Sequence, residues 1–346
     1  MSNPFTISFG RQPAQFISRP VETNEIIENF EQEPPSSQVY MLTGVRGSGK
    51  TVLMTDIAKE LSKRENWLVV ELSTERDMLT SLAAKLCSRP ELFALFVEAK
   101  LNFSLLGFGV EVKNAAPISD IETALARMLG VIRSAGKKLL VTVDEAVNNP
   151  NVRVFASTFQ IFMRQEYPVF LLMTGLYDNI HNLQNEKTLT FLYRAPKITL
   201  GPLNLTSIRL QYAKIFGISM KEAGRMADLT MGYPFAFQVL GYLYWNSRDA
   251  KTLDEVLPEY DRYLEEYVYS KIWSELSETD KQIVAVMAAT GKTKVGEIRE
   301  EVAMKPEKFS VYRERLKRKG VIDTSRYGAV TFALPRFDVF VRMMTE

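Results

Sequence analysis

Residues 38–51 read QVYMLTGVRGSGKT, an apolar run that leads into a glycine-rich turn and then into helical periodicity. Residues 44–51 match the pattern G-x-x-x-x-G-K-[ST] at every fixed position. Glycines let such a loop curl so that backbone N–H groups point at phosphate oxygens, and the helix that follows adds the positive end of its dipole. The stretch therefore predicts a buried strand, a phosphate-binding loop and a helix in succession.

The chemistry of the loop assigns a role to most of its positions. We expect Lys50 to neutralise the β- and γ-phosphate oxygens of ATP and Thr51 to offer its hydroxyl to Mg²⁺. Arg46 could contact phosphate or face solvent, and the expectation is solvent. The residues predicted to contact the nucleotide here are Gly44, Val45, Arg46, Gly47, Ser48, Gly49, Lys50, Thr51 and Val52.

A second candidate element is an apolar strand that ends in two acids, residues 138–145, which read KLLVTVDE. Two carboxylates at the end of a buried strand are costly unless a cation compensates them. We expect Asp144 to hold Mg²⁺, directly or through water, and Glu145 to act as a general base on the attacking water. The alternative is that the acids cap the helix that follows.

Two further residues have two interpretations each. Thr174 ends the predicted strand 169–174 and could reach the γ-phosphate or the lytic water, or it could serve the turn before Gly175. Arg194 precedes the last predicted strand and could contact the γ-phosphate as an arginine finger, or form a surface salt bridge. If Arg194 acts on a neighbouring copy, the protein must be a homo-oligomer.

The fold class follows from strands that alternate with helices. Such an order predicts an α/β fold of the P-loop NTPase kind, a parallel sheet with helices on both faces. Alternating apolar residues over 101–113 predict an inserted β-hairpin. After Gly201-Pro202, residues 202–275 are helical and form a predicted lid. The predicted strands are 38–43, 67–72, 139–143, 169–174 and 197–200, and the helices between them are about 22–30, 52–61, 77–87, 118–134 and 152–166.

Residues 276–346, the C-terminal module, have the pattern of a winged-helix domain. We predict helices at about 278–289, 294–302 and 306–319, followed by strands at about 321–324 and 330–334. From 305 to 319 there are seven basic residues against Glu307 and Glu314: Lys305, Lys308, Arg313, Arg315, Lys317, Arg318 and Lys319. With Arg326 in the wing, the segment 305–328 could bind double-stranded DNA, although a protein partner stays open.

Composition excludes several other classes of site. The 43 basic and 41 acidic residues give a net charge of +2, which says nothing about a nucleic-acid partner. Cys87 and His181 are the only residues of their kinds, so an intramolecular disulfide and a multi-histidine metal site are excluded. The start has no secretion signal, and no apolar run approaches the roughly 20 residues of a membrane helix. We expect a cytoplasmic protein without a membrane span.

The order of these elements resembles the AAA+/STAND-related P-loop ATPases, in particular the prokaryotic archaeal-ATPase family and origin-recognition-like ATPases. The resemblance implies an adenine-side segment at 1–37 that includes Arg19. It implies that Asp144-Glu145 are the Walker B acids, Thr174 the sensor 1 position and Arg194 the arginine before residues 200–203. Residues 232–236 look like the lid's G-x-P element, in which Pro234 contacts adenine; a plain helix–helix turn is the alternative.

The same resemblance implies three domains: a P-loop ATPase at 1–201, a lid at 202–275 and a winged helix at 276–346. The implied function is a slow, ATP-hydrolysing switch that couples its ATP or ADP state to the winged helix. One departure is that residues 235–238 lack the sensor 2 arginine of origin-recognition ATPases. The alternatives are a STAND-like signalling or scaffold ATPase whose winged helix binds protein, and a nucleotide-binding module with little hydrolysis.

Overall fold

The computed structural model describes residues 2–7, 13–107, 116–248 and 250–345. The chain forms two compact units. The sheet unit consists of Arg19–Thr43 and Lys50–Thr199, and the helical unit consists of Met1–Ser18, Gly44–Gly49 and Leu200–Glu346. The loop stretch Gly44–Gly49 thus belongs with the helices of the second unit, although the strand before it and the helix after it belong to the first.

The sheet unit is built on five parallel strands in the order β2-β3-β4-β1-β5. The register pairs Val143 with Met173 and Leu42 with Thr174, so the carboxyl ends of β3, β4 and β1 meet at one edge, where α/β folds bind ligands. The predicted fold class is confirmed. The strands are β1 Val39–Thr43, β2 Trp67–Leu72, β3 Lys138–Val143, β4 Val169–Gly175 and β5 Lys197–Thr199.

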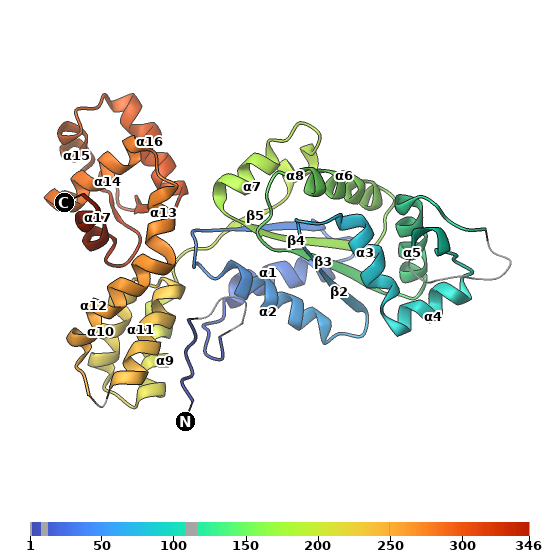
Figure 1. Ribbon diagram of the computed structural model, residues 1–346, viewed down its shortest axis with the longest axis horizontal. Coiled ribbons are helices and arrows are strands. Elements are labelled where there is room, and N and C mark those ends of the chain that lie inside the picture. The colour runs from blue at the N-terminus through green and yellow to red at the C-terminus, as the bar shows by residue number, and fades with distance from the viewer. Residues whose placement is uncertain (1, 8–12, 108–115, 249, 346) are drawn as a thin grey trace. The chain divides into compact units, whose positions relative to one another are not determined.

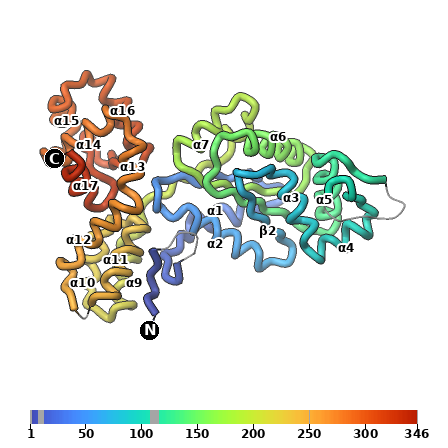
Figure 2. The backbone as a smooth tube through the Cα atoms, viewed as in Figure 1, coloured from blue at the N-terminus to red at the C-terminus, as the bar shows by residue number. Residues whose placement is uncertain are grey.

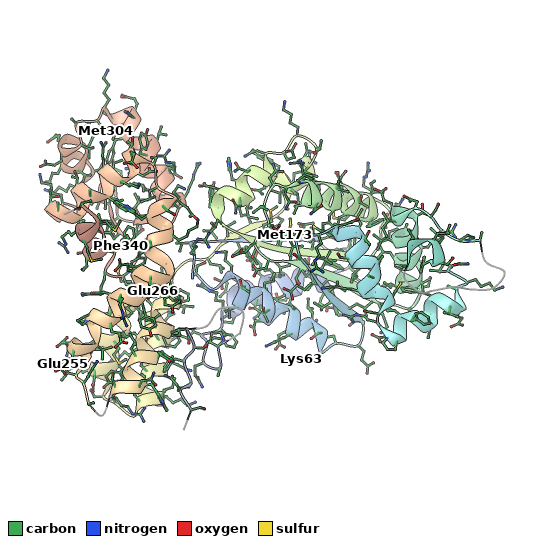
Figure 3. The ribbon with its side chains drawn as sticks, in the orientation of Figure 1. Lys63, Met173, Glu255, Glu266, Met304 and Phe340 are labelled. Carbon is green, nitrogen blue, oxygen red and sulfur yellow. The ribbon has the colours of Figure 1, made fainter. Side chains whose placement is uncertain are left out.

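Helices cover both faces of this sheet (Figure 1). Alternate strand residues point to opposite faces. Met41 and Met173 belong to the core under α3, α5, α6 and α7, whereas Tyr40 and Phe170 contact Phe30 of α1 on the other face. Met173 is labelled inside the sheet layer in Figure 3. The helices are α1 Pro20–Glu31, α2 Lys50–Ser62, α3 Met78–Cys87, α5 Ile121–Ser134, α6 Pro150–Arg164 and α7 Tyr177–Gln184.

The region of the predicted hairpin differs from the expectation. Residues 104–106 form a short 3-10 helix, η1 Ser104–Leu106, and Asn102 makes a single bridge with Pro117. The predicted strand over 101–106 is therefore wrong, because the apolar residues Leu101 and Phe103 are buried in the core of the sheet unit without strand pairing. Residues 108–113 of the prediction lie outside the described residues. Three helices of the sheet unit were not predicted: α4 Pro90–Glu98, α7 and α8 Thr190–Arg194.

The helical unit begins with the N-terminal segment packed on the lid helices. Phe5, 2% exposed, stacks on Phe216 and meets Phe237 edge-on. The side chain of Gln238 accepts a hydrogen bond from Thr6 N and donates one to Gln15 O, which ties the segment to α11. The lid helices are α9 Leu205–Phe216, α10 Met220–Thr230, α11 Pro234–Ser247 and α12 Leu253–Leu264.

A continuous helix links the lid to the C-terminal module. Helix α12 runs through a π-helical turn, η2 Glu265–Tyr269, into α13 Ser270–Ser274 without a break (Figure 2). Figure 3 labels Glu255 and Glu266 along it. Single π-turns inside α-helices are frequent at functional sites. Residues 253–274 therefore form one rod that ends beside Glu275.

The C-terminal module has the predicted order of three helices and an antiparallel hairpin. An isolated antiparallel bridge joins Lys294, the residue before α15, to Ala329 in the loop between the two strands. The final helix was not predicted, and its Phe337 and Phe340 pack on Tyr269 of the π-turn. The elements are α14 Glu278–Thr290, α15 Val295–Glu301, α16 Pro306–Arg318, β6 Ile322–Asp323, β7 Thr331–Phe332 and α17 Phe337–Thr345. Within the described ranges, every helix is too short or too polar to cross a membrane.

Candidate functional site

The loop has the tightly curled backbone that its glycines predict. Gly47 and Gly49 have φ of +71° and +86°, a region that side chains other than glycine rarely adopt. The Ser48 N–H donates to Val45 O at 3.2 Å and closes the turn. A Cβ on Gly44 would lie 2.5 Å from Ser48 Oγ. The curl therefore depends on glycine at these positions.

Within the helical unit, the loop is held by residues Gly232, Tyr233, Pro234 and Phe235, here called the lid turn. The Phe235 N–H donates to Gly47 O at 3.2 Å, and the Tyr233 hydroxyl donates to Arg46 O. Burial raises the pKa of Tyr233 well above its usual range, so the hydroxyl stays a donor. Pro234 lies 3.8 Å from where a Cβ on Gly49 would be.

Val45 and Arg46, which follow Gly44 at positions that the loop pattern leaves open, contact the C-terminal part of the helical unit. Arg46 Nη2 lies 3.2 Å from Glu275 Oε1, just after α13. A Cβ added to Gly320, after α16, would lie 2.9 Å from Val45 Cβ. The Arg46 guanidinium is thus half-exposed and pairs with the Glu275 carboxylate, a contact that the sequence did not predict.

In the sheet unit, a hydrogen-bonded cluster forms at the carboxyl edge of the strands. Asp144 Oδ2 accepts a hydrogen bond from Thr51 Oγ1 at 2.9 Å, and Oδ1 accepts one from the Thr174 hydroxyl. Thr174 is fully buried, and the strand register brings it to Asp144. Of its two interpretations, the side chain thus faces the acid and not the turn at Gly175.

Glu145 occupies an unusual backbone position. Its φ is +49°, and such a conformation in a residue other than glycine costs on the order of 1–3 kcal/mol. Its N–H contacts Asp144 Oδ1 at 3.0 Å and Thr174 Oγ1 at 3.2 Å, while its side chain is exposed. Helix α6 begins only at Pro150 and is capped by Asn149, so neither acid caps that helix. The helix-cap alternative is wrong.

The cluster has the donors that Mg²⁺ prefers, which are hard oxygen ligands. The Thr51 hydroxyl and the Asp144 carboxylate contact each other at 2.9 Å. Among the described residues, no group of three or more His, Cys, Asp or Glu side chains could hold a metal. A cation at this cluster would therefore take further ligands from phosphate oxygens and water, as Mg²⁺ does in nucleotide sites. The residues present fit that role.

The family comparison agrees with this arrangement. Residues 36–205, which contain the loop, both acids and all five strands, match a family described as an AAA domain. The chain carries an AAA-type P-loop ATPase domain. Residues 266–341 match a second family, which is described as a domain of unknown function, DUF8462. No curated protein matches the chain.

Solved structures resemble the AAA domain together with the rest of the chain. A Walker-type ATPase of Pyrococcus abyssi is 17% identical, with a TM-score of 0.64 over 94% of this chain and 96% of that one. The ORC2 protein of Aeropyrum pernix, in ADPNP–ADP complexes, is 14% identical, with a TM-score of 0.59 over 97% and 95%. Cdc6p of Pyrobaculum aerophilum is 14% identical, with a TM-score of 0.51 over 98% and 96%. These likenesses show the fold.

Arg194 and Arg19, the two remaining arginine candidates, have different surroundings. Arg194, the last residue of α8, is exposed, and no described residue forms an ion pair with it. The surface salt bridge proposed as its alternative is therefore not seen in the described part of the chain. Arg19 precedes α1 and is 9% exposed, with Nη1 3.4 Å from Glu22 Oε1. Burial lowers the pKa of Arg19. Its role beside adenine, like that of Pro234, stays a prediction.

The basic segment of the C-terminal module is less available than its sequence predicts. Arg315 pairs with Asp280, which is 1% exposed, at 2.7 Å. Arg318 pairs with Glu314 at 3.1 Å, and Lys319 Nζ donates to Glu275 O at 3.4 Å. Three of the seven basic residues are therefore engaged by other groups of the helical unit. Within the described ranges no ion pair involves Lys305, Lys308 or Arg313, and Arg326 of the wing is exposed.

Sequence reasoning missed the contacts that the loop makes inside the helical unit. Glu275 lies 229 positions from Arg46, and no local pattern joins them. The lid turn was singled out for Pro234, but nothing in the sequence indicates that the neighbouring Tyr233 hydroxyl and Phe235 N–H bind loop carbonyls. The only available signal was glycine at position 47, which the phosphate-loop pattern does not fix.

Proposed function

We propose that this chain is an ATP-driven molecular switch in which the nucleotide state of the loop controls the C-terminal module. The observation that carries the proposal is the double contact from the loop: Val45 packs on Gly320, and Arg46 pairs with Glu275. These two partners follow α16 and α13, so one short stretch of loop touches both the module and the helical rod that leads into it.

The chemistry of binding is assigned residue by residue. The loop amides and Lys50 would hold the phosphates of ATP, and Thr51 with Asp144 would hold Mg²⁺, which neutralises phosphate charge when bound. Thr174 fixes the Asp144 carboxylate by its hydroxyl. The exposed Glu145 carboxylate, at the end of β3, would accept a proton from the attacking water. The ADPNP and ADP present in the similar ORC2 protein support this class of ligand.

Slow turnover suits such a device, because a switch gains from holding one state. Arg194 is the candidate arginine finger, since it is exposed and ends α8 beside β5. Its action on a neighbouring copy would need a homo-oligomer. A mixing experiment tests this: inactive Lys50→Ala and Arg194→Ala proteins should regain ATPase activity together if the arginine acts in trans. Absence of any recovery at all mixing ratios would contradict it.

For the output of the switch, we propose double-stranded DNA bound by the C-terminal module. The support is a set of basic side chains on and just before α16, Lys305, Lys308 and Arg313, which form no ion pair in the described part of the chain, together with the exposed Arg326 in the wing. Replacing Lys305, Lys308 and Arg313 by Gln should reduce the slope of log K against log salt by about 3, since each phosphate contact contributes roughly 0.9. Lys251→Gln, in the lid, is the matched control. An unchanged slope would remove α16 from the interface.

The coupling itself has a sharper test, because linkage is reciprocal. If ATP changes DNA affinity by some factor, DNA must change ATP affinity by the same factor. Arg46→Ala removes the ion pair with Glu275 and should bring both factors toward one. Arg225→Ala breaks the exposed ion pair with Asp254 instead, and as a control it should leave both factors unchanged. Coupling that survives in Arg46→Ala would contradict the role of the loop contact.

The second candidate function is a signalling or scaffold ATPase whose module binds protein. The observation in its favour is the exposure of apolar groups on the same segment, Val311 at 66% and Tyr327 at 102%. Protein interfaces favour such side chains, whereas DNA backbones do not. Absence of duplex binding at low salt would decide for this candidate.

A further inference from the structure

We infer that the Tyr233 hydroxyl and the Phe235 amide at the start of α11 position the phosphate-binding loop, so that the lid turn sets phosphate affinity without touching phosphate. The inference rests on the proposed function, because it assumes that the loop binds nucleotide. It concerns positioning residues, since neither group is placed at the reacting atoms.

The two hydrogen bonds act on consecutive peptide planes. Tyr233 donates to Arg46 O, which belongs to the peptide that carries the Gly47 N–H. Phe235 N donates to Gly47 O at 3.2 Å, which belongs to the peptide that carries the Ser48 N–H. In a planar trans peptide, the carbonyl oxygen and the amide hydrogen point in opposite directions. Holding both carbonyls toward the lid turn therefore turns both amides away from it.

Orientation of amides is what gives such a loop its affinity for anions. The Ser48 N–H closes the turn on Val45 O at 3.2 Å, which shapes the curl from inside. The lid turn shapes it from outside. A glycine has more conformational freedom than any other residue, and Gly47 lies between the two held peptides. Without the hydrogen bonds from the lid turn, the peptides on either side of Gly47 can rotate, and ordering them when phosphate binds would lower the affinity for phosphate.

The lid turn is itself firmly built. The Tyr233 N–H donates to Thr230 O at 2.8 Å, and the Leu203 N–H donates to Gly232 O at 2.7 Å. A Cβ on Gly232 would lie 2.6 Å from Leu203 O, so this approach also requires glycine. The Phe235 ring contacts Tyr267 on the π-turn, with centroids 6.3 Å apart. A rigid clamp can orient the loop, whereas a flexible one could not.

The space around Gly47 shows that the contact is close. A Cβ there would overlap the Tyr233 hydroxyl and lie 2.9 Å from Phe235 Cβ. By contrast, a Cβ on Gly49 would meet only Pro234, at 3.8 Å. The phosphate-loop pattern fixes glycine at position 49 but not at 47. The close approach of the lid turn therefore explains why position 47 is a glycine, which the phosphate-loop pattern does not require.

The test is Tyr233→Phe, which removes the hydroxyl and keeps the ring. A hydrogen bond of this kind corresponds to about a tenfold change in an equilibrium constant. We expect the dissociation constants of ATP, ADP and inorganic triphosphate, measured by titration calorimetry, to rise by the same factor of about 5–20. Equal factors are expected because the loop binds phosphates and not the base.

The matched control is Tyr212→Phe. Tyr212 is also fully buried in the helical unit, and its hydroxyl donates to a backbone carbonyl, Phe237 O, at 2.8 Å, away from the loop. It should lower stability to unfolding by a similar amount and leave all three affinities unchanged. A Tyr233→Phe protein that binds inorganic triphosphate as the wild type does would overturn the inference. So would a loss confined to ATP and ADP, which would place Tyr233 on the base.

Failure of the inference can be told from failure of the proposed function. If the wild-type protein binds neither ATP nor triphosphate, the proposed function is wrong. If the wild type binds both and Tyr233→Phe binds them equally well, only the positioning role is wrong.

Discussion

The contact between Gly47 and the lid turn leads to a prediction with a matched comparison inside the loop. Gly47 and Gly49 both have positive φ, but only Gly47 faces a neighbour at close range. We therefore expect Gly47→Ala to destabilise the helical unit more than Gly49→Ala does. Gly291, which ends α14 at φ +65° with no atom within 4 Å of an added Cβ, supplies a third alanine variant for backbone strain alone.

The magnitudes follow from two separate costs. An alanine in the left-handed region costs roughly 1–2 kcal/mol, which is the whole expected effect for Gly49→Ala and Gly291→Ala. At Gly47 the added methyl group also overlaps the Tyr233 hydroxyl and Phe235 Cβ. Overpacking of this kind adds about 1–3 kcal/mol, so Gly47→Ala should cost about 2–5 kcal/mol in the free energy of unfolding.

Urea unfolding followed by tryptophan fluorescence measures these values, since Trp245 and Trp273 both lie in the helical unit. A double-mutant cycle isolates the contact. In a Tyr233→Ala background the overlap with Phe235 Cβ remains, so Gly47→Ala should cost less than in the wild type but still more than the strain of about 1–2 kcal/mol. Equal costs for Gly47→Ala and Gly49→Ala, or the same cost of Gly47→Ala with and without the tyrosine, would refute the reasoning.

Three further predictions concern the sheet unit. Glu145→Gln should lower ATP turnover by about 10²–10⁴ and leave ATP affinity unchanged, with the exposed Glu75→Gln as control; undiminished turnover would leave only a binding module. Thr174→Val should cost about 1–3 kcal/mol in unfolding free energy, because the fully buried Thr174 hydroxyl and its hydrogen bond to the Asp144 carboxylate are lost, while Thr174→Ser should be mild; equal effects would contradict this. Burial raises the pKa of Cys87 to about 11, so its thiol should react slowly with a disulfide reagent at pH 8 until the chain unfolds. Because the pKa of the Cys87 thiol is higher in the folded chain than the unfolded value of 9.0, its contribution to folding stability is complete below pH 9 and is lost as the pH rises toward 11. Rapid labelling of Cys87 in the native chain would contradict the raised pKa.

The parts of the site that sequence predicted are those with local signatures. Phosphate binding requires glycines, a lysine and a hydroxyl at fixed spacing, so residues 44–51 carry their chemistry within one turn. The acids at 144–145 follow an apolar strand, and a parallel sheet brings strand ends together. Thr174 lies beside Asp144 because the neighbouring strand carries it to the same edge of the sheet.

The parts that escaped prediction depend on contacts between distant segments. Arg46 pairs with Glu275, because the end of a helix far along the chain lies beside the loop within the helical unit. Three of the seven basic residues at 305–319 are engaged by neighbours that composition cannot reveal. At 101–106, the alternation of apolar residues predicted a strand. The same alternation also occurs where apolar side chains are buried in the core and the backbone does not pair with another strand, as here.

The most direct test of the central claim is calorimetric titration of ATP and Mg²⁺ into the wild-type protein and Lys50→Ala. Lys63→Ala, just beyond the same helix and paired with Glu60, is the control. Loss of binding in Lys50→Ala alone is predicted, because the ammonium group that follows the curled loop is missing. Micromolar ATP affinity retained by Lys50→Ala, or no binding by the wild type, would contradict the claim that this loop captures the phosphates.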